Sequence, residues 1–349
     1  IIKHNARVYN CAFGHINRAA VFSELMYLLL CGCGVGFSVQ AHHVRDLPPI
    51  ARPNPNRVKK YVVPDSIEGW SDSIGVLISS YFVGIARFDE FVGHTVDFDF
   101  SEIRPAGAKL SSGSKAPGPE GLRRSIGKIK EVLDSCLGSS NRVKVRPIDV
   151  YDVIMHSADA VISGGVRRSA TIALFSPEDE DMAKAKTGNW FTENPQRGRS
   201  NNSALLIRDE TSRKDFDQLM EWVKEFGEPG FVWADNREMG FNPCVEIGLY
   251  PVDETTGESG WQFCNLAEIN GKKAQSPEKF YRACRVAAII GTLQASYTSF
   301  PYLSEATENI TRREALLGVS ITGMMDNPDV LFSPKVQRRG AKIVKDINR

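Results

Sequence analysis

The stretch RVYNCAFGHINRAAVFSELMYLLLCGCGVGFSVQ, residues 7–40, contains the pattern that decides the fold class. Its first part, RVYNCAF (7–13), tends to alternate and carries Val, Tyr and Phe, which favours a β-strand. The apolar spacing of AAVFSELMYLLL (19–30) is typical of a buried helix. The glycines of CGCGVGFSVQ (31–40) then turn the chain into a second short strand. Strand, helix and strand within about 40 residues predict a βαβ unit.

Strands and helices alternate along the rest of the chain, which predicts an α/β fold with mostly parallel strands. Helices are expected after an N-cap at Asp65 or Ser66, over 120–136 and 147–162, from 212 to a C-cap at Gly227, and from Pro277 onward. Strands are expected where the glycine loop of SGGVRRSATIALF (163–175) leads into a strand, in SNNSALLI (200–207) and near WQFCNLAEIN (261–270). No internal repeat or clear domain boundary interrupts this order.

The composition is that of a globular protein. The chain has 349 residues, a formal net charge of +1 at pH 7 and a charged share of 24%. Near-neutral charge gives no support for a nucleic-acid partner or a membrane surface, and no apolar run reaches the ~18 residues of a membrane span. There is no initiator methionine, no signal peptide and no evident stop, so we expect a segment of a longer protein.

The seven cysteines are sparse, widely spaced and odd in number, which favours a reducing cytoplasm over a secreted disulfide framework. The one close pair, Cys31 and Cys33, has no second pair and no histidine at ligand spacing, which disfavours a zinc site. A buried thiol at a helix end is the favoured interpretation of Cys31. The sequence therefore predicts no metal ligand.

The segment FNPCVEIGLY, residues 241–250, is the candidate reactive segment. Asn242, Cys244 and Glu246 are two positions apart, so on an extended backbone an amide, a thiol and a carboxylate would face one spot. A buried glutamate at this spacing would raise the pKa of the thiol, which disfavours a nucleophilic cysteine. The arrangement suits hydrogen-atom chemistry at sulfur, with the carboxylate accepting a substrate proton. A buried structural thiol is the alternative for Cys244.

Two glycine-rich motifs invite a nucleotide-binding interpretation. GCGVGF (32–37) follows a predicted helix and precedes a strand, the reverse of a dinucleotide-binding fingerprint, so close backbone approach is favoured there. GGVRRSA (164–170) combines backbone amides with Arg167 and Arg168, whose forked donors suit phosphate; an ordinary solvated turn is equally open. RPAGAKLSSGSKAPGPEGL (104–122) is either a flexible linker or an ordered loop near a ligand.

Taken in order, these motifs resemble one enzyme family. NPCVEI with the later FCNLAEIN resembles the active-site signature of ribonucleotide reductases. The other motifs that follow the family's order across most of the chain are YNCAF, YLLLCGCGVGFS, DFSEIRPAGAKLSSGSKAPGPEGL, VISGGVRRSATIALF, GEPGFVWADN and LGVSITGMMD. The Gly/Pro-rich stretch is most similar to the adenosylcobalamin-dependent class II enzymes. The best likeness is to the monomeric ribonucleoside-triphosphate reductases and their phage relatives.

The resemblance implies a ten-stranded α/β barrel of two parallel half-barrels, with a finger loop through its middle. Residues 1–349 would be a single catalytic barrel domain truncated at both ends: the first half-barrel, the finger loop and the start of the second half. Residues 42–150 would include insertion and effector-region helices. These residues alone are expected to be inactive and poorly folded, with an unclosed sheet edge.

The resemblance also implies roles for five side chains. Cys244, on the finger loop, would form a thiyl radical that takes the 3′ hydrogen of the ribose. Glu246 would remove the 3′-hydroxyl proton, the 2′-hydroxyl would leave as water, and Asn242 would hold the ribose hydroxyls. Cys11 and Cys264, on adjacent strands, would supply two electrons and become a disulfide, which a thioredoxin-like reductant would restore.

The ligands follow from the same resemblance. The substrate would be a ribonucleoside triphosphate or diphosphate, with Gly34 lining its pocket beside Asn242 and Glu246, and adenosylcobalamin would be the cofactor. SGGVRRSA (163–170) matches the family's specificity loop. A deoxynucleotide effector is therefore expected at Gly164, Gly165, Arg167 and Arg168. Cys33 departs from the small or hydroxyl residue expected at its position.

Three alternatives stay open at this point. A class I large subunit would need a separate metal-containing radical subunit, and the C-terminal tyrosine pair that would mark it falls outside these residues. A non-catalytic nucleotide-binding relative is disfavoured because the five residues with implied chemical roles are intact. A thiol hydrolase lacks its histidine.

Overall fold

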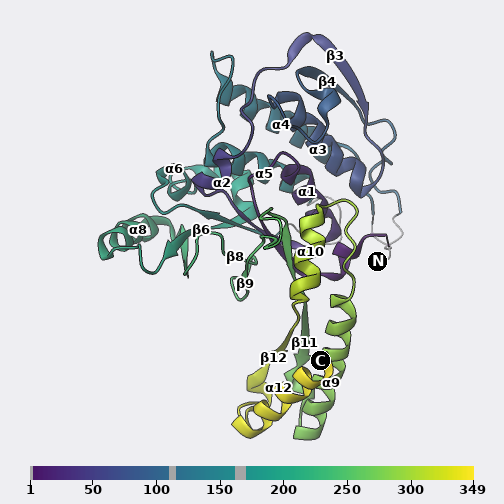
Figure 1. The fold of residues 1–349 in the computed structure, drawn as a ribbon, viewed down its shortest axis with the longest axis vertical. Helices are drawn as coiled ribbons and strands as arrows, with labels where there is room; N and C mark the ends of the chain where they lie inside the picture. Colours follow the sequence, from purple (N-terminus) through teal and green to yellow (C-terminus); the bar gives the residue numbers. More distant parts are fainter. Residues whose placement is uncertain (1–2, 110–114, 162–169) are drawn as a thin grey trace.

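The structure is a computed structural model that describes residues 3–109, 115–161 and 170–349. Its centre is a six-stranded sheet with the strand order β10-β1-β2-β5-β6-β7 (Figure 1). Neighbouring strands from β1 to β7 run parallel, and β10 runs antiparallel to β1. The strands are β1 Cys11–His15, β2 Gly34–Ser38, β5 Thr171–Phe175, β6 Ser200–Ile207, β7 Gly230–Ala234 and β10 Trp261–Cys264. The predicted α/β fold with mostly parallel strands is confirmed.

The βαβ unit predicted from residues 7–40 is present as β1, α1 (Val21–Cys31) and β2. β1 and β2 pair in parallel, and every residue of both strands is buried. Gly32 ends α1 with a φ of 93°, a left-handed conformation that glycine adopts without steric penalty. The first strand begins later than predicted. Asn5–Val8 form the 3-10 helix η1, because both neighbouring strands pair with β1 only from Cys11 onward.

The predicted long helices are present, and α3, α4 and α5 form a layer with α1 (Figure 1). Ser66, Ser212 and Ser276 cap α3, α8 and α9 by accepting backbone N–H bonds, and Gly227 ends α8 with a φ of 71°. Buried apolar side chains between α1, α3, α4 and α5 belong to one core cluster. The bounds are α3 Ile67–Tyr81, α4 Glu120–Leu137, α5 Pro147–Val161, α8 Arg213–Phe226 and α9 Pro277–Ala295.

Shorter elements complete the body. Two strands, β3 (Asn54–Val62) and β4 (His94–Asp99), pair in parallel as a separate sheet next to α3. Other short helices of the body are α2 Ala41–Arg45, η2 Asp89–Phe91, α6 Glu180–Ala183, α7 Trp190–Glu193 and η4 Pro195–Arg199. Among the described residues, no helix combines the length and apolar character needed to cross a bilayer.

The C-terminal part forms an arm that projects from the body (Figure 1). Its core is a parallel pair of strands, β11 (Leu266–Asn270) and β12 (Gly318–Thr322), packed against α9. WQFCNLAEIN therefore contains two strands, β10 and β11, that belong to different sheets. The other elements of the arm are η5 Gly271–Lys273, η6 Met324–Asp326, α11 Pro328–Leu331 and α12 Pro334–Asn348. Helix α10 (Glu305–Glu314) instead packs against β10 of the six-stranded sheet.

The described residues do not form a ten-stranded barrel. They form one six-stranded sheet and three two-stranded sheets. On α9, the apolar side chains of Ile289, Ile290 and Leu293 are 45–61% exposed, which leaves an apolar face of the kind that packed neighbours usually cover. The predicted inactivity and poor folding of these residues alone stay predictions.

Candidate functional site

The candidate site is built on a row of three residues across neighbouring strands. Cys11 in β1 lies directly opposite Cys264 in antiparallel β10 and directly opposite Gly34 in parallel β2. Residues that lie opposite one another on paired strands point to the same face of the sheet. The two cysteines expected on adjacent strands are therefore neighbours, and Gly34 adds no side chain beside them. We call Cys264, Cys11 and Gly34 the thiol row.

Backbone hydrogen bonds around Asn10 hold the thiol row in register. The Asn10 amide donates to the carbonyl oxygen of Cys264 at 3.2 Å, and the Gly34 amide donates to the carbonyl oxygen of Asn10 at 2.8 Å. The side-chain oxygen of Asn10 accepts a bond from the Leu266 amide at 2.8 Å. Asn10 thus joins four strands at the point where the chain leaves the six-stranded sheet.

Both thiols of the row are buried, with exposed fractions of 6% for Cys11 and 0% for Cys264. The pKa of Cys264 is raised by its hydrogen bond with Cys11, by burial, and by the negative charges of Cys11 and Glu246. A raised pKa keeps this thiol protonated across the neutral range, because the thiolate is disfavoured. The pair is therefore suited to donating hydrogen and protons rather than to attack as a thiolate.

The segment 241–250 is a hairpin rather than one extended strand. β8 (Gly240–Phe241) and β9 (Gly248–Leu249) pair antiparallel, and the chain reverses between them. Val245 has a φ of 67°, and its amide donates to the carbonyl oxygen of Asn242 at 2.9 Å. The Asn242 side-chain oxygen accepts a bond from the Ile247 amide at 3.0 Å and closes the turn. The prediction of an extended, alternating segment was wrong because these turn bonds outweigh the local strand pattern.

The tip of the hairpin rests on the thiol row. Asn242 is fully buried, and its Nδ2 donates to the sulfur of Cys11 at 3.8 Å. A Cβ atom added to Gly34 would lie 3.2 Å from Cγ of Pro243 and 3.4 Å from Sγ of Cys11. The missing side chain of Gly34 therefore provides the space in which the proline ring and the thiol meet.

The base of the hairpin packs closely on the sheet because Gly36 and Gly240 have no side chains. A Cβ atom on Gly36 would overlap the carbonyl oxygen of Phe241, and one on Gly240 would overlap the ring of Phe13. β2 and the hairpin are thus in backbone contact, which larger residues would prevent.

Cys244 and Glu246 are exposed at the tip of the hairpin. The sequence argument assumed a buried glutamate, and that assumption was wrong, since the turn directs this part of the loop to solvent. A cavity of about 300 Å³ opens beside the loop and Cys264, at the small end of the range for ligand pockets. It is bounded by Ile247, Cys264, Asn265, Leu266, Leu316, Leu317, Gly318, Val319 and Ser320.

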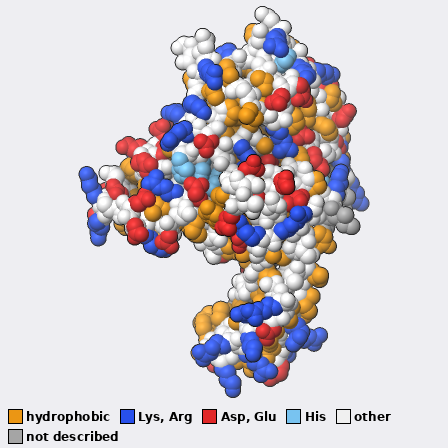
Figure 2. All heavy atoms as spheres, viewed as in Figure 1, with side chains coloured by type: hydrophobic (Ala, Val, Ile, Leu, Met, Phe, Trp, Pro, Cys, Tyr) orange, Lys and Arg blue, Asp and Glu red, His pale blue; other side chains and the backbone are white. Residues whose placement is uncertain are grey.

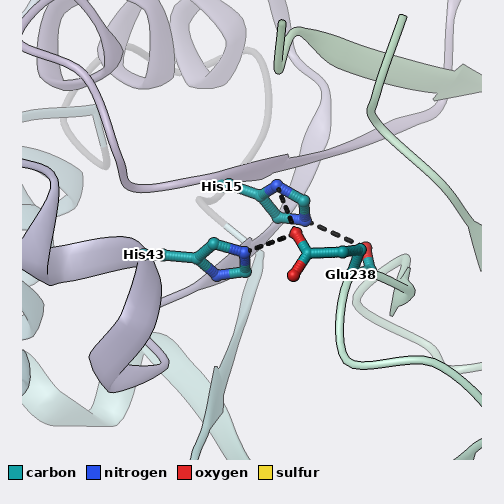
Figure 3. Close-up of side chains that lie close together, drawn as sticks. All are labelled: His15, His43 and Glu238. Atoms are coloured by element: carbon teal, nitrogen blue, oxygen red, sulfur yellow. Dashed lines mark hydrogen bonds and ion pairs between the residues drawn. The ribbon is translucent and has the colours of Figure 1, made fainter. Parts of the chain in front are cut away.

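A second polar cluster lies at the other end of β1. His15 ends β1, His43 lies in α2 and Glu238 precedes β8, and both rings point toward the glutamate (Figure 3). The ring of His15 bonds the backbone oxygen of Glu238 at 2.9 Å, and the ring of His43 lies 2.9 Å from its carboxylate. Burial lowers the pKa of His15 to about 3. Hydrogen bonds from His42 and His43 hold the pKa of Glu238 well below its usual range.

The sequence identified part of this arrangement and missed the rest. Cys11, Cys264, Gly34 and Asn242 lie together, whereas Cys244 and Glu246 lie on the same hairpin but in solvent. The predicted effector residues Gly164, Gly165, Arg167 and Arg168 lie outside the described residues. The sequence analysis missed Asn10, Pro243 and the histidine cluster. Pro243 stands inside NPCVEI, but nothing local links His43 to Glu238, which is 195 positions away.

Comparison with curated proteins finds several adenosylcobalamin-dependent ribonucleoside-triphosphate reductases that are similar to this chain. The chain is 26% identical over 347 residues to the adenosylcobalamin-dependent ribonucleoside-triphosphate reductase of Euglena gracilis, covering 91% of this chain and 43% of that protein. It is 27% identical over 352 residues to the enzyme of the same name from Lactobacillus leichmannii, covering 87% and 45%. A probable enzyme of this name from Dictyostelium discoideum is 26% identical over 287 residues, covering 76% and 34%. The chain thus spans less than half the length of these relatives. No family model matches it.

A solved structure has a similar fold over most of this chain. The crystal structure of a B-12-dependent (class II) ribonucleotide reductase aligns with a TM-score of 0.71 and 22% identity, over 91% of this chain and 50% of that chain. The fold is therefore of the class II ribonucleotide reductase type. Together with the curated relatives, this match confirms the resemblance that the sequence motifs indicated.

Proposed function

We propose that the chain is part of an adenosylcobalamin-dependent reductase that converts ribonucleoside triphosphates to 2′-deoxyribonucleotides. The main support is the thiol row beneath the hairpin tip, where two buried thiols lie beside the buried Asn242 amide, with a third thiol, Cys244, exposed on the same hairpin. The names of the curated relatives support the triphosphate substrate and the cofactor. The cavity beside Cys264 is the proposed entry for the ribose.

In the proposed reaction, Cys244, Glu246, Cys11 and Cys264 each have a distinct role. A thiyl radical on Cys244 removes the 3′ hydrogen atom of the ribose, and Glu246 takes the 3′-hydroxyl proton. The 2′-hydroxyl accepts a proton from the thiol pair and leaves as water. Cys11 and Cys264 give two electrons and their second proton to the 2′ carbon of the sugar and form a disulfide. Glu246 returns its proton to the 3′ oxygen, and the hydrogen atom on Cys244 returns to the 3′ carbon. Ribonucleotide and dithiol thus become deoxyribonucleotide, disulfide and water.

The protonation and hydrogen bonding of the site support this assignment. The raised pKa of Cys264 keeps a proton available for the leaving hydroxyl. The side-chain oxygen of Asn242 is occupied by the Ile247 amide. Its Nδ2 group is therefore the end that faces Cys11 and, in the proposed complex, a ribose hydroxyl. A fixed amide donor positions the sugar without competing for the proton that Glu246 removes.

When bound, adenosylcobalamin would supply the oxidising equivalent that takes the hydrogen atom from the Cys244 thiol. The chain fits this role in one respect: Cys244 is exposed at the hairpin tip, so a group outside the loop can approach its sulfur. We assign no described side chain as a cobalt ligand. A deoxynucleotide effector at residues 163–170, a thioredoxin-like reductant for the disulfide and a cytoplasmic location complete the proposal.

The test is an anaerobic assay of the full-length reductase of which we propose this chain is part, with CTP, a dithiol and adenosylcobalamin, in which deoxynucleotide is quantified. We expect product with the wild type, and none without the cofactor or with Cys244→Ala. Cys136→Ala, which removes a cysteine on α4 away from the site, should keep full activity. Product that persists in Cys244→Ala would overturn the proposed radical site. Product that requires an added metal-containing radical subunit would assign the chain to class I.

A further inference from the structure

The hydrogen bonds of His15 show which of its ring nitrogens carries a proton. Nε2 lies 2.9 Å from the backbone carbonyl oxygen of Glu238, and a carbonyl can only accept, so Nε2 is the donor. In the neutral imidazole, Nδ1 therefore carries a lone pair. Nδ1 lies 3.6 Å from Oε2 of Glu238, so two acceptors face each other across this gap. A cation between them would convert their repulsion into attraction.

The second histidine of the cluster is oriented by its neighbours. Nδ1 of His43 is hydrogen-bonded to the hydroxyl of Ser38 at 2.9 Å, and Nε2 lies 2.9 Å from Oε2 of Glu238. The side-chain amide of Gln40 donates to the same hydroxyl at 3.0 Å. Histidines that bind metal ions almost always have their second ring nitrogen in a hydrogen bond of this kind. His15 and His43 both satisfy that condition.

Protons alone are a poor source of positive charge for this cluster. The rings of His15 and His43 are stacked, with centroids 3.8 Å and planes 17° apart, and the ring of His42 lies 3.9 Å from that of His43. Three imidazolium ions at these separations would repel one another, and His15 is only 1% exposed. A single ion shared by the lone pairs and the carboxylate would neutralise the same groups without that repulsion.

The spacing of the ligand atoms suits a small transition-metal ion. One ligand atom from each of His15, His43 and Glu238 lies within 4.8 Å of the others. Ligands at about 2.0–2.2 Å in a tetrahedral zinc site are roughly 3.3–3.6 Å apart. The two histidine–carboxylate separations are 2.9 Å for His43 and 3.6 Å for His15, so shifts of a few tenths of an ångström would bring both into this range.

The surroundings of Glu238 also suit a metal site. His42 lies 2.9 Å from Oε1 and so holds the carboxylate oxygen that faces away from His43. The side chain of Glu238 is 34% exposed, which leaves one side accessible to water or to an entering ion. Figure 2 shows histidine side chains at the surface of this face, between acidic and basic groups.

We propose that His15, His43 and Glu238 bind one divalent transition-metal ion, preferably Zn²⁺, which fixes the base of the hairpin to the sheet. Two imidazoles and one carboxylate with an open fourth position form a recurrent zinc-ligand set. Glu238 comes two positions before β8, and His15 ends the strand that begins with Cys11. The ion would thus hold the loop that carries Cys244 in position over the thiol row. The sequence predicted no metal ligand because these three come from separate segments.

The first experiment measures metal binding without substrate or cofactor, so its outcome is independent of the proposed reductase activity. The purified protein is stripped with a chelator, and Zn²⁺ and Co²⁺ are titrated separately in the absence of adenosylcobalamin. We expect one Zn²⁺ per chain and the visible absorption bands of four- or five-coordinate Co²⁺. Substoichiometric Zn²⁺, or Co²⁺ spectra of the hexaaqua ion only, would overturn the proposal and leave a proton-bonded histidine cluster.

Substitutions of the proposed ligands test where the ion binds. Glu238→Gln and His43→Ala should abolish stoichiometric binding, and Ser38→Ala, which removes only the supporting hydroxyl, should weaken the affinity about 10- to 100-fold. His94→Gln, in β4 and outside the cluster, should bind as the wild type does. Circular dichroism verifies that each variant is folded. Equal binding by folded Glu238→Gln and wild type would place the metal elsewhere and refute the assignment.

A second measurement tests the structural role of the ion. Amide hydrogen exchange of residues 239–249 should slow when Zn²⁺ is added to the stripped wild type, and should not respond in Glu238→Gln. Residues 213–226 of α8, which contain no proposed ligand, serve as the internal control. Binding that leaves exchange in the hairpin unchanged would contradict the role of the ion in fixing its base.

Discussion

The two ends of β1 hold the same hairpin in different ways. At the first end, Cys11 is placed by strand pairing on both sides, and the hairpin tip packs on it through Asn242 and the space left by Gly34. At the other end, His15 reaches the base of the hairpin through a hydrogen bond from its Nε2 to the backbone oxygen of Glu238. Backbone register thus determines the thiol end, and side-chain chemistry determines the histidine end.

The two kinds of contact should tolerate amino-acid substitution to different degrees. Backbone pairing does not depend on the identity of a side chain, so the cysteines of the thiol row can be replaced without loss of the row itself. The contact between sheet and hairpin depends on residues that lack side chains, and there even one added carbon must displace the loop. Substitutions at the cysteines and at the glycines should therefore have different consequences for activity and for stability.

Replacing Cys11 by serine should have the largest functional effect. Strand pairing and the neighbouring Asn242 amide accept a hydroxyl in place of the thiol, so the fold should be kept. A disulfide with Cys264 can no longer form, and turnover with a dithiol should fall to background. Deoxynucleotide formation and circular dichroism measure the two expectations, with Cys136→Ser as the matched control. Undiminished turnover would show that Cys11 is not part of the reducing pair.

Gly36→Ala should have the largest effect on stability. Its Cβ would overlap the carbonyl oxygen of Phe241, so the hairpin or β2 must shift, at a cost of about 1–3 kcal/mol in the free energy of unfolding. Gly127→Ala is the control: this exposed glycine of α4 has no atom within 4 Å of the new carbon, and alanine should stabilise the helix by about 0.5–1 kcal/mol. Urea unfolding measures both. Equal effects of the two variants would contradict the close approach of β2 and the hairpin.

Gly34→Ala should lower the activity while changing the stability little. The new Cβ meets only the far side of the Pro243 ring and the sulfur of Cys11, at 3.2 and 3.4 Å, so the free energy of unfolding should change by less than about 1 kcal/mol. The hairpin tip should move by a few tenths of an ångström, and the rate of deoxynucleotide formation should fall several-fold. A stability loss as large as that of Gly36→Ala would mean that the tip is held as tightly as the base.

The smallest effect concerns the protonation of Cys264. Because its pKa is raised, the thiolate is scarce at pH 8, whereas about a quarter of an ordinary thiol is ionised there. Iodoacetamide should therefore label Cys264 far more slowly than Cys244, and labelling should increase only as pH rises above the ordinary thiol range. Mass spectrometry of peptides measures both rates. Glu246→Gln removes one negative charge and should accelerate labelling of Cys264 slightly; slower labelling would reverse the proposed electrostatic role.

Much of the local structure was predictable because short-range interactions determine it. Ser66, Gly227 and Pro277 mark helix ends through their own backbone preferences and capping bonds, and the structure has them at those ends. The predictions of local structure failed where residues distant in the chain determine the conformation. The strand expected from residue 7 begins at Cys11, since only there do both partner strands pair with it. The alternation in 241–250 gives way to a turn at Val245.

The α/β class and the βαβ unit follow from local patterns along the chain, because periodicity, caps and turn residues are all local properties. The residues of the proposed reactive groups were named from short motifs, which are also local. Three contacts arise only in the folded molecule: Cys11 lies opposite Cys264, the Pro243 ring packs over Gly34, and His15, His43 and Glu238 meet. These contacts join positions that lie far apart in the chain. They depend on strand register and on close approach of backbones, which local patterns along one segment do not specify.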